Sequence, residues 1–130
     1  MTRLLVDTHV LLWLLLTPDR IPDRTREQLA DPAADVFVSA ASAWEIATKH
    51  RLGKLTGAES VVGGYPEHLD RLRATEIPVT SRHALTAGML TWEHRDPFDR
   101  MIVSQSMIES VPLVTADVTV AAFPGVRIIW

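Results

Sequence analysis

Acidic and hydroxyl side chains in this sequence stand directly after short apolar runs. Asp7, Ser39 and Thr115 each follow such a run directly, and Asp117 comes two residues after Thr115. In an open parallel sheet, functional groups gather beyond the carboxyl ends of the strands, at a switch in strand order. If the apolar runs are strands of one such sheet, these side chains lie along one of its edges.

Three further acids are candidates for the same edge. Asp96 and Asp99 open the helix that leads into the strand before Thr115. Glu45 lies inside Ala40–Ala47, where its neighbours are small or apolar on almost every side. Burying a carboxylate there is costly unless its charge is compensated, and a cation shared with other carboxylates would compensate it. The alternative for Glu45 is an ordinary ion pair with Lys49, four residues further along the helix.

The residue types favour one kind of chemistry. The sequence has no cysteine, and its histidines lack the paired spacing of a zinc motif. Carboxylate oxygens without such ligands favour Mg²⁺ or Mn²⁺ over zinc. Several acids around one or two of these ions form a hydrolytic site for phosphodiesters, because the metal lowers the pKa of a bound water.

Each of the other acids also has a purely structural interpretation. An aspartate after a strand commonly caps the next helix, and this applies to Asp7. Asp96 followed by Pro97 is a good start for a helix, and Asp99 fits the third position of the same pattern. Asp117 fits an ordinary turn. A site is therefore indicated by the joint position of the acids and not by any one of them.

Short apolar strands alternate with helices of about ten residues, which indicates an α/β domain with a parallel sheet. The predicted strands are Leu4–Val6, Val36–Val38, Ile77–Val79, Val111–Val114 and Arg127–Trp130. The predicted helices are Thr8–Leu16, Pro22–Ala30, Ala40–Leu52, Pro66–Ala74, Ser81–Leu90 and Asp96–Ser110, and the Gly-rich segment Thr56–Gly64 is a predicted loop. No repeat or linker interrupts this pattern, so residues 1–130 are expected to form one domain.

Composition sets further limits on the function. The chain has 130 residues, 47% of them hydrophobic, and a net charge of −3, so bulk attraction to nucleic acid or membrane is not evident. The absence of cysteine excludes disulfides, a thiolate nucleophile and iron–sulfur clusters, and it fits a reducing, cytoplasmic location. The apolar run Val10–Leu16 is far shorter than the roughly 20 residues of a membrane span and lacks a following cleavage site. It is expected to be a buried helix.

Four segments together resemble the PIN domain, and more narrowly the VapC-type toxins of prokaryotic toxin–antitoxin pairs. They are Val6–His9, Ser39–Ala47, His94–Met101 and Leu113–Asp117. The resemblance covers the chain from end to end. It implies a three-layer α/β/α fold with a central parallel sheet and a Mg²⁺-dependent endoribonuclease in which Mn²⁺ is a possible substitute. The alternative is a PIN-fold protein that is catalytically silent and only binds RNA or an antitoxin.

The resemblance also implies roles for particular residues and partners. The acidic quartet would be Asp7, Glu45, Asp99 and Asp117. Asp7 and Asp99 would ligate the metal directly, and the other two directly or through water. Accessory positions would be Asp96 and three hydroxyl residues that orient acids or water, namely Thr8, Ser39 and Thr115. The implied partners are a cognate antitoxin, an RNA substrate and a second copy of the chain in a homodimer.

Basic and aromatic side chains near the acids are candidates for contacts with RNA. The basic candidates for binding phosphates are Lys49, Arg51, Lys54, Arg95 and Arg100; Arg100 has the alternative of bracing Asp99, its neighbour in the chain. Among the tryptophans, Trp13 and Trp44 lie in apolar helices and are predicted to be core residues. Trp92 lies in a predicted loop and is the candidate for stacking on a base.

Overall fold

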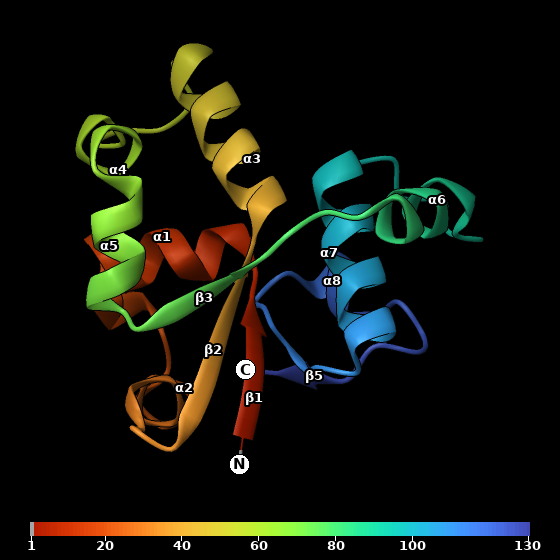
Figure 1. Cartoon of the computed structure of the whole chain (residues 1–130), viewed down its shortest axis with the longest axis horizontal. Helices are drawn as coiled ribbons and strands as arrows, with labels where there is room; N and C mark the ends of the chain where they lie inside the picture. Colours follow the sequence, from red (N-terminus) through yellow and green to blue (C-terminus); the bar gives the residue numbers. More distant parts are fainter. Residues whose placement is uncertain (1) are drawn as a thin grey trace.

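Strand β1 (Thr2–Val6) lies in the middle of a parallel sheet of five strands. In the computed structural model, which describes residues 2–130, the strand order is β3-β2-β1-β4-β5 (Figure 1). The other strands are β2 (Ala34–Ser39), β3 (Ala74–Ile77), β4 (Leu113–Val114) and β5 (Ile128–Ile129). Leu4, Leu5 and Val6 have no exposed surface, as expected of a strand covered on both faces. The predicted α/β class and parallel sheet are confirmed.

The register of the strands places three residues at one edge of the sheet. Val6 of β1 pairs with Val38 of β2 on one side and with Val114 of β4 on the other. The chain runs from β1 outward to β2 and β3, then returns to the opposite side of β1 as β4. The switch in strand order therefore lies between β1 and β4, and this is where α/β proteins bind ligands.

Helices cover both faces of the sheet (Figure 1). On one side are α1 (Thr8–Leu16), α2 (Asp23–Ala30), α4 (Glu59–Gly63) and α5 (Tyr65–Arg71), with the 3₁₀ turn η1 (Pro18–Arg20); on the other are α6 (Ser81–Met89), α7 (Pro97–Glu109) and α8 (Val118–Ala121). Helix α3 (Ala40–Arg51) rises from the carboxyl edge of the sheet and contacts both α1 and α7. Within residues 2–130, no helix has the length and apolar character needed to span a membrane.

The two layers of helices enclose separate hydrophobic cores. Leu4 and Val6 of β1 pack against α1, α2, α3 and α5, whereas Leu5 faces Ile102 and Val103 of α7. This alternation follows from the period of two in a strand. The predicted three-layer α/β/α architecture is confirmed, and β1 is held from both sides at the point where it delivers Asp7.

Several predicted elements differ from the structure. The helix predicted at Pro66–Ala74 is α5, which ends at Arg71, and Ala74 is already the first residue of β3. The short helix α8 was not predicted. The third strand is predicted at Ile77–Val79 but ends at Ile77, because Pro78 has no N–H to donate to a neighbouring strand. The segment Thr56–Gly64 is predicted as a loop but contains α4, which is fixed by the fully buried Val61. Burial of that valine in the core overrides the weak helix propensity of the glycines around it.

Candidate active site

Asp7 is fixed at the end of β1 through both of its carboxylate oxygens. Oδ1 accepts a hydrogen bond of 2.7 Å from the backbone N–H of Val10 and so caps α1. Oδ2 accepts the hydroxyl proton of Thr115, which follows β4. The residue is 8% exposed. Burial raises the pKa of Asp7, the bonds from Thr115 and Val10 and the charge of His9 oppose the rise, and the charge of Glu45 adds to it.

Thr115 joins Asp7 to Asp117. Its hydroxyl accepts a hydrogen bond of 3.0 Å from the backbone N–H of Asp117 while donating to Asp7. The Asp117 carboxylate caps α8 by accepting from the N–H groups of Thr119 at 2.8 Å and Val120 at 3.4 Å. Thr115 thus orients Asp7, and Asp117 belongs to the same bonded chain although its side chain serves the adjacent helix.

Glu45 is buried in α3, at 3% exposure. Its Oε2 lies 2.5 Å from Nζ of Lys49, so the ion pair between positions four apart is present. The pair is not an ordinary surface pair, because the carboxylate is almost fully enclosed and only the lysine reaches solvent. The charge of Glu45 raises the pKa of both Asp7 and Asp99, so Glu45 lies within electrostatic reach of these two acids.

Asp99 lies in the first turn of α7. Its Oδ2 is 2.7 Å from Nε2 of His94, in the segment before the helix. Burial raises the pKa of Asp99 to about 6, and the charges of Asp96 and Glu45 add to the rise. The hydrogen bond and the charge of His94 oppose it. Asp96 itself caps α7 by accepting from the N–H groups of Phe98 and Asp99, as its structural interpretation predicts.

Three predicted acids, at the end of β1, in α3 and in α7, are linked by the effect of the Glu45 charge on the pKa of Asp7 and Asp99, but they do not form a closed cage. Among residues 2–130 there is no group of three or more His, Asp or Glu side chains arranged closely enough to hold a metal ion. Their oxygens contact Thr115, Lys49 and His94 instead.

The donors nevertheless fit a hard divalent cation. They are carboxylate oxygens, the ligands that Mg²⁺ takes in proteins. A carboxylate has about four lone-pair sites, so the present hydrogen bonds leave acceptor capacity. The raised pKa of Asp7 and of Asp99 reflects burial and repulsion from a nearby carboxylate. A bound cation would offset the cost of burying these carboxylates and would reduce the repulsion between them.

Two of the predicted accessory hydroxyls have other partners. Ser39 accepts a hydrogen bond of 3.1 Å from the N–H of Ala41 and caps α3. Thr8 bonds at 2.9 Å to the hydroxyl of Ser42, which is fully buried and joins α1 to α3. Neither hydroxyl bonds to one of the acids directly; Ser39 caps the helix that carries Glu45, Thr8 joins that helix to α1, and their role in orienting acids or water stays a prediction. Ser42 was missed because a serine between alanines gives no local signal.

The prediction that Arg100 binds phosphate is wrong. Its guanidinium donates to the backbone oxygens of five residues in α6 and the segment after it: Ala87, Gly88, Leu90, Trp92 and His94. These carbonyls belong to the end of a helix and to a loop, where intrahelical partners are lacking. Arg100 also does not brace Asp99, although the two are adjacent in the sequence; the residue that contacts Asp99 is His94.

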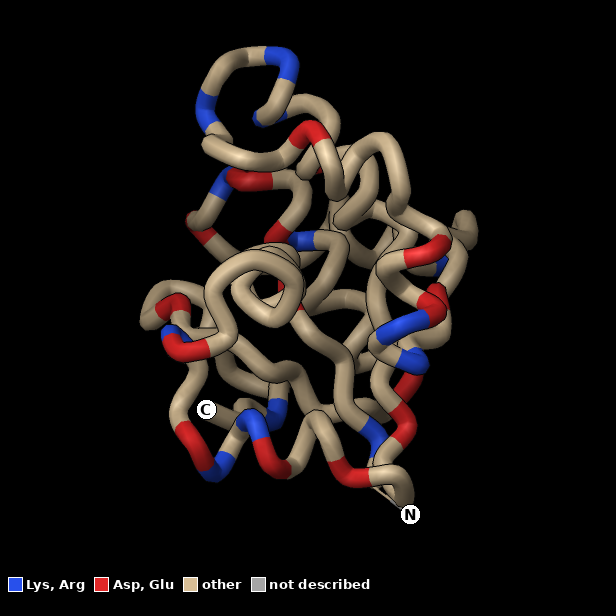
Figure 2. Tube along the Cα trace, turned by 90° about the vertical axis from the view of Figure 1, so that its left-hand side faces the viewer, with Lys and Arg blue, Asp and Glu red and all other residues tan. Residues whose placement is uncertain are grey.

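The remaining basic candidates lie in α3, just after it, or just before α7. Lys49 is paired with Glu45, whereas Arg51, Lys54 and Arg95 are exposed. Lysine and arginine gather at the top of the molecule, where α3 ends (Figure 2). This cluster is therefore positioned beyond the acids on the helix that carries Glu45.

The prediction that Trp44 is a core residue is wrong, whereas Trp92 lies in a loop as predicted and its contact with a base stays a prediction. Trp44 is 63% exposed instead of belonging to the core. Trp92 is partly buried and packs against the rings of Phe123 and His94, at centroid distances of 4.8 and 4.9 Å. Trp13 packs against the core as predicted. The error arose because the apolar neighbours of Trp44 do not show which side of α3 faces outward.

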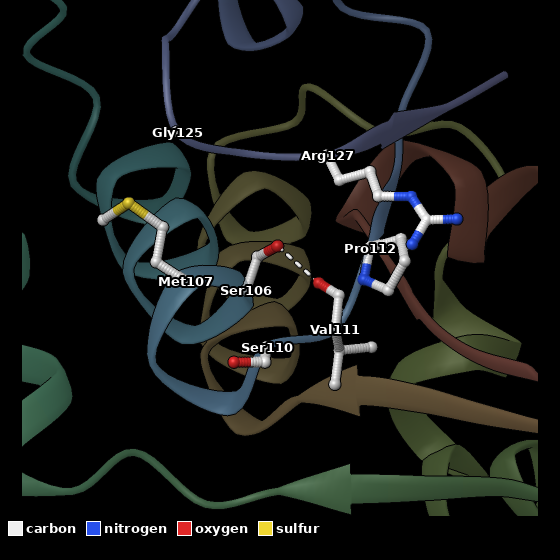
Figure 3. A pocket seen from close by; sticks show the side chains of 7 residues that line it. All are labelled: Ser106, Met107, Ser110, Val111, Pro112, Gly125 and Arg127. Atoms are coloured by element: carbon white, nitrogen blue, oxygen red, sulfur yellow. Dashed lines mark hydrogen bonds between the residues drawn. The ribbon is translucent and has the colours of Figure 1, made fainter.

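A cavity of about 270 Å³ lies at the other end of the sheet. It is formed where α7 ends and β4 begins, and Ser106, Pro112 and Arg127 are among its lining residues (Figure 3). The hydroxyl of Ser106 donates to the backbone oxygen of Val111 there. None of the acids described above lines this cavity, so it is separate from the candidate active site.

Comparison with known proteins identifies the fold and the family of the chain. The family model of the PIN domain matches residues 4–125. Ribonuclease VapC16 of Mycobacterium tuberculosis is 38% identical over 61 residues, which are 47% of this chain and 43% of that protein. The chain therefore matches less than half of the length of this relative.

Solved structures of similar fold include DNA-bound VapBC from Salmonella typhimurium, with a TM-score of 0.71, 18% identity and coverage of 99% of this chain and 98% of that chain. VapBC2 from Rickettsia felis, bound to a promoter fragment, has a TM-score of 0.69 and 16% identity, with 98% of both chains covered. FitAcB from Neisseria gonorrhoeae has a TM-score of 0.63 and 18% identity, with 98% and 96% covered. These likenesses concern the fold, and with the family match they show that the chain belongs to the PIN domain family.

Proposed function

We propose that this protein is a divalent-metal-dependent endoribonuclease and the toxin of a toxin–antitoxin pair. The observation that carries the proposal is the burial of Asp7 after β1, beside the switch point of the sheet, with Glu45 near enough for its charge to raise the pKa of both Asp7 and Asp99. Membership of the PIN family and the similarity to a protein named as a ribonuclease support the same activity. A cytoplasmic location belongs to the same proposal.

Asp7 and Asp99 are the residues that would hold Mg²⁺ or Mn²⁺ directly. Glu45 and Asp117 would complete the site, directly or through water. A bound cation of this kind supplies Lewis-acid activation of water and neutralises charge on a phosphodiester. No nucleophilic side chain of the protein is needed for that reaction, so the task of the chain is to position ligands and substrate.

The chain performs this task through fixed hydrogen bonds. Thr115 and the Val10 N–H hold the Asp7 carboxylate in one orientation. His94 holds Asp99 from the side of the segment before α7. Lys49 places a positive charge against Glu45, which lowers the cost of burying that carboxylate. The exposed Arg51, Lys54 and Arg95 are available for contacts with RNA phosphates.

Cleavage of single-stranded RNA tests the proposed activity. The wild type is expected to cleave in Mg²⁺ or Mn²⁺ and to stop in EDTA. Asp7→Asn and Asp99→Asn should each reduce the rate at least about 100-fold, because each removes charge needed to hold the metal. Asp70→Asn is the matched control, since Asp70 is an exposed aspartate of α5. A wild type that does not cleave with either metal would contradict the activity.

Growth inhibition separates this proposal from the catalytically silent alternative. Expression of the wild type should arrest growth, and the two Asn variants should not. If Asp7→Asn and Asp99→Asn arrest growth as strongly as the wild type, the protein acts by binding RNA or an antitoxin without turnover.

A cognate antitoxin and a homodimer belong to the same proposal. The similar solved structures include complexes named VapBC, and α1 leaves Leu16 41% exposed at its end. We expect the product of a small neighbouring gene to copurify with the protein and to inhibit cleavage. Co-expression with an affinity tag on one partner measures the complex, and sedimentation measures whether two copies of the chain are present. A neighbouring product that neither binds nor inhibits would contradict the antitoxin assignment.

A further inference from the structure

Trp44 is a large apolar side chain that the fold leaves in solvent. It is 63% exposed, although it lies on α3 directly before Glu45, which is 3% exposed. Consecutive residues lie about 100° apart around a helix, so α3 turns Glu45 into the protein while Trp44 stays at the surface. Single exposed apolar residues are common on protein surfaces, so the groups around the ring of Trp44 decide whether it can bind a ligand.

The ring of Trp44 is held in place by α7. It meets the ring of Phe98 edge-on, with a centroid distance of 4.8 Å and an angle of 72° between the planes. Phe98 directly precedes Asp99, just as Trp44 directly precedes Glu45. The aromatic pair therefore bridges the two helices that carry two of the acids, and it lies at the rim of the candidate active site.

The charges near the ring suit a polyanion. Arg51 is seven residues after Trp44, about two turns or roughly 10 Å along α3 on the same face, and both residues are exposed. Arg95 is exposed just before the start of α7. Exposed guanidinium groups at the end of α3 and just before α7, the two helices that carry the aromatic pair, fit phosphates beside a base better than they fit an apolar protein surface.

We propose that Trp44 is a stacking platform for an unpaired base of a single-stranded RNA whose backbone passes the acids. The inference rests on the proposed nuclease function and adds a preference for single strands. A base in a duplex is already stacked on its neighbours and does not offer its face to a side chain. Trp44 is on this view a residue that binds and positions the substrate, and the Phe98 ring fixes its orientation.

The test is binding of a labelled single-stranded RNA of about 12 nucleotides, measured by fluorescence anisotropy in EDTA and, in the Asp7→Asn background, in Mg²⁺. Trp44→Ala is expected to raise the Kd about tenfold. Trp44→Phe should restore most of the affinity, because a smaller ring still stacks. Leu85→Ala is the matched control, since Leu85 is an apolar residue with 70% exposure on α6. The same sequence as a duplex should bind Trp44→Ala and wild type equally.

The outcomes distinguish this inference from the nuclease proposal. If the wild type cleaves RNA but Trp44→Ala binds the single strand as tightly as the wild type, the stacking role alone is overturned. A wild type that binds through Trp44 without cleaving would support stacking and contradict the nuclease. Failure of the wild type to bind the single strand would overturn the inference. The inference would also be overturned if Trp44→Ala bound RNA as tightly as the wild type but sedimented as a monomer where the wild type is a dimer. In that case a second copy of the chain covers the ring.

Discussion

At the scale of single residues, the structural and chemical interpretations of an acid turn out to be compatible. Asp7 caps α1 with one oxygen and is held by Thr115 through the other. Asp117 caps α8 and is joined to Asp7 through the same threonine. A cap places a carboxylate at the start of a helix in a fixed orientation, and a metal ligand needs such an orientation. The same bonds that begin the helices therefore also prepare the candidate site.

The raised pKa of Asp99 predicts that the metal-free protein loses stability as the pH rises. Asp99 has a folded pKa of about 6 against an ordinary value of 3.8, so between these values the folded state binds more protons than the unfolded state. The unfolding free energy then falls with increasing pH across this window, and burial of Asp7 acts in the same direction. Urea unfolding in EDTA at pH 5 and pH 7 measures the difference.

A neutral side chain at position 99 should weaken this pH dependence. In Asp99→Asn the titrating group is gone, so the variant is expected to be more stable than the wild type at pH 7 without metal, provided that its contact with His94 is kept. Asp70→Asn should leave the pH dependence unchanged, because Asp70 is exposed. Equal pH dependence in wild type and Asp99→Asn would contradict the raised pKa.

At the scale of elements, Arg100 explains how α6 is attached to α7. Helix α6 ends with carbonyl groups that lack intrahelical partners. Two nitrogens of the Arg100 guanidinium accordingly donate to Ala87 at 2.9 Å and to Leu90 at 2.8 Å. Its bonds to the carbonyls of Trp92 and His94, both at 2.9 Å, fix the segment from which His94 contacts Asp99. One side chain therefore joins an element of the fold to an acid of the site.

Arg100→Ala is expected to destabilise the protein by about 2–4 kcal/mol, since it leaves several carbonyl groups without a donor. Arg100→Lys should recover only part of the loss, because an ammonium group lacks the planar fork of a guanidinium. Arg95→Ala should change the unfolding free energy by less than about 0.5 kcal/mol, as Arg95 is exposed. Urea unfolding measures all three variants, and an Arg100→Ala protein as stable as wild type would exclude this role.

At the scale of the whole molecule, the cost of gathering acids from distant parts of the chain predicts a response to metal. Mg²⁺ at millimolar concentration is expected to raise the melting temperature, because a ligand that binds only the folded state stabilises it. The increase should be larger at pH 7.5 than at pH 5, since Asp99, with a pKa of about 6, is mostly protonated at the lower pH. Thermal shift with Mg²⁺ measures this, and Asp7→Asn should show a smaller increase. No change at either pH would count against a shared metal site.

Much of the architecture is predictable from local sequence. The strand before Asp7 and the helix from Thr8 to Leu16 occur where the apolar run and the aspartate cap place them. Asp96 and Pro97 mark the start of α7. These features depend on residues close together in the chain, and short-range sterics and capping decide them. Helix α4 was missed because burial of Val61 in the core, a long-range effect, stabilises it.

The sequence by itself determined the α/β class, the positions of the acids at the ends of strands and the residue types that favour a hard cation. Only the tertiary structure decided which groups face one another: His94 contacts Asp99, Thr115 contacts Asp7, and Lys49 contacts a buried Glu45. It also decided that Trp44 faces solvent and that Arg100 serves backbone carbonyls. The physical reason is that hydrogen bonds and burial depend on the packing of α3 and α7 against the sheet, and helical periodicity alone does not show which side of a helix that packing covers.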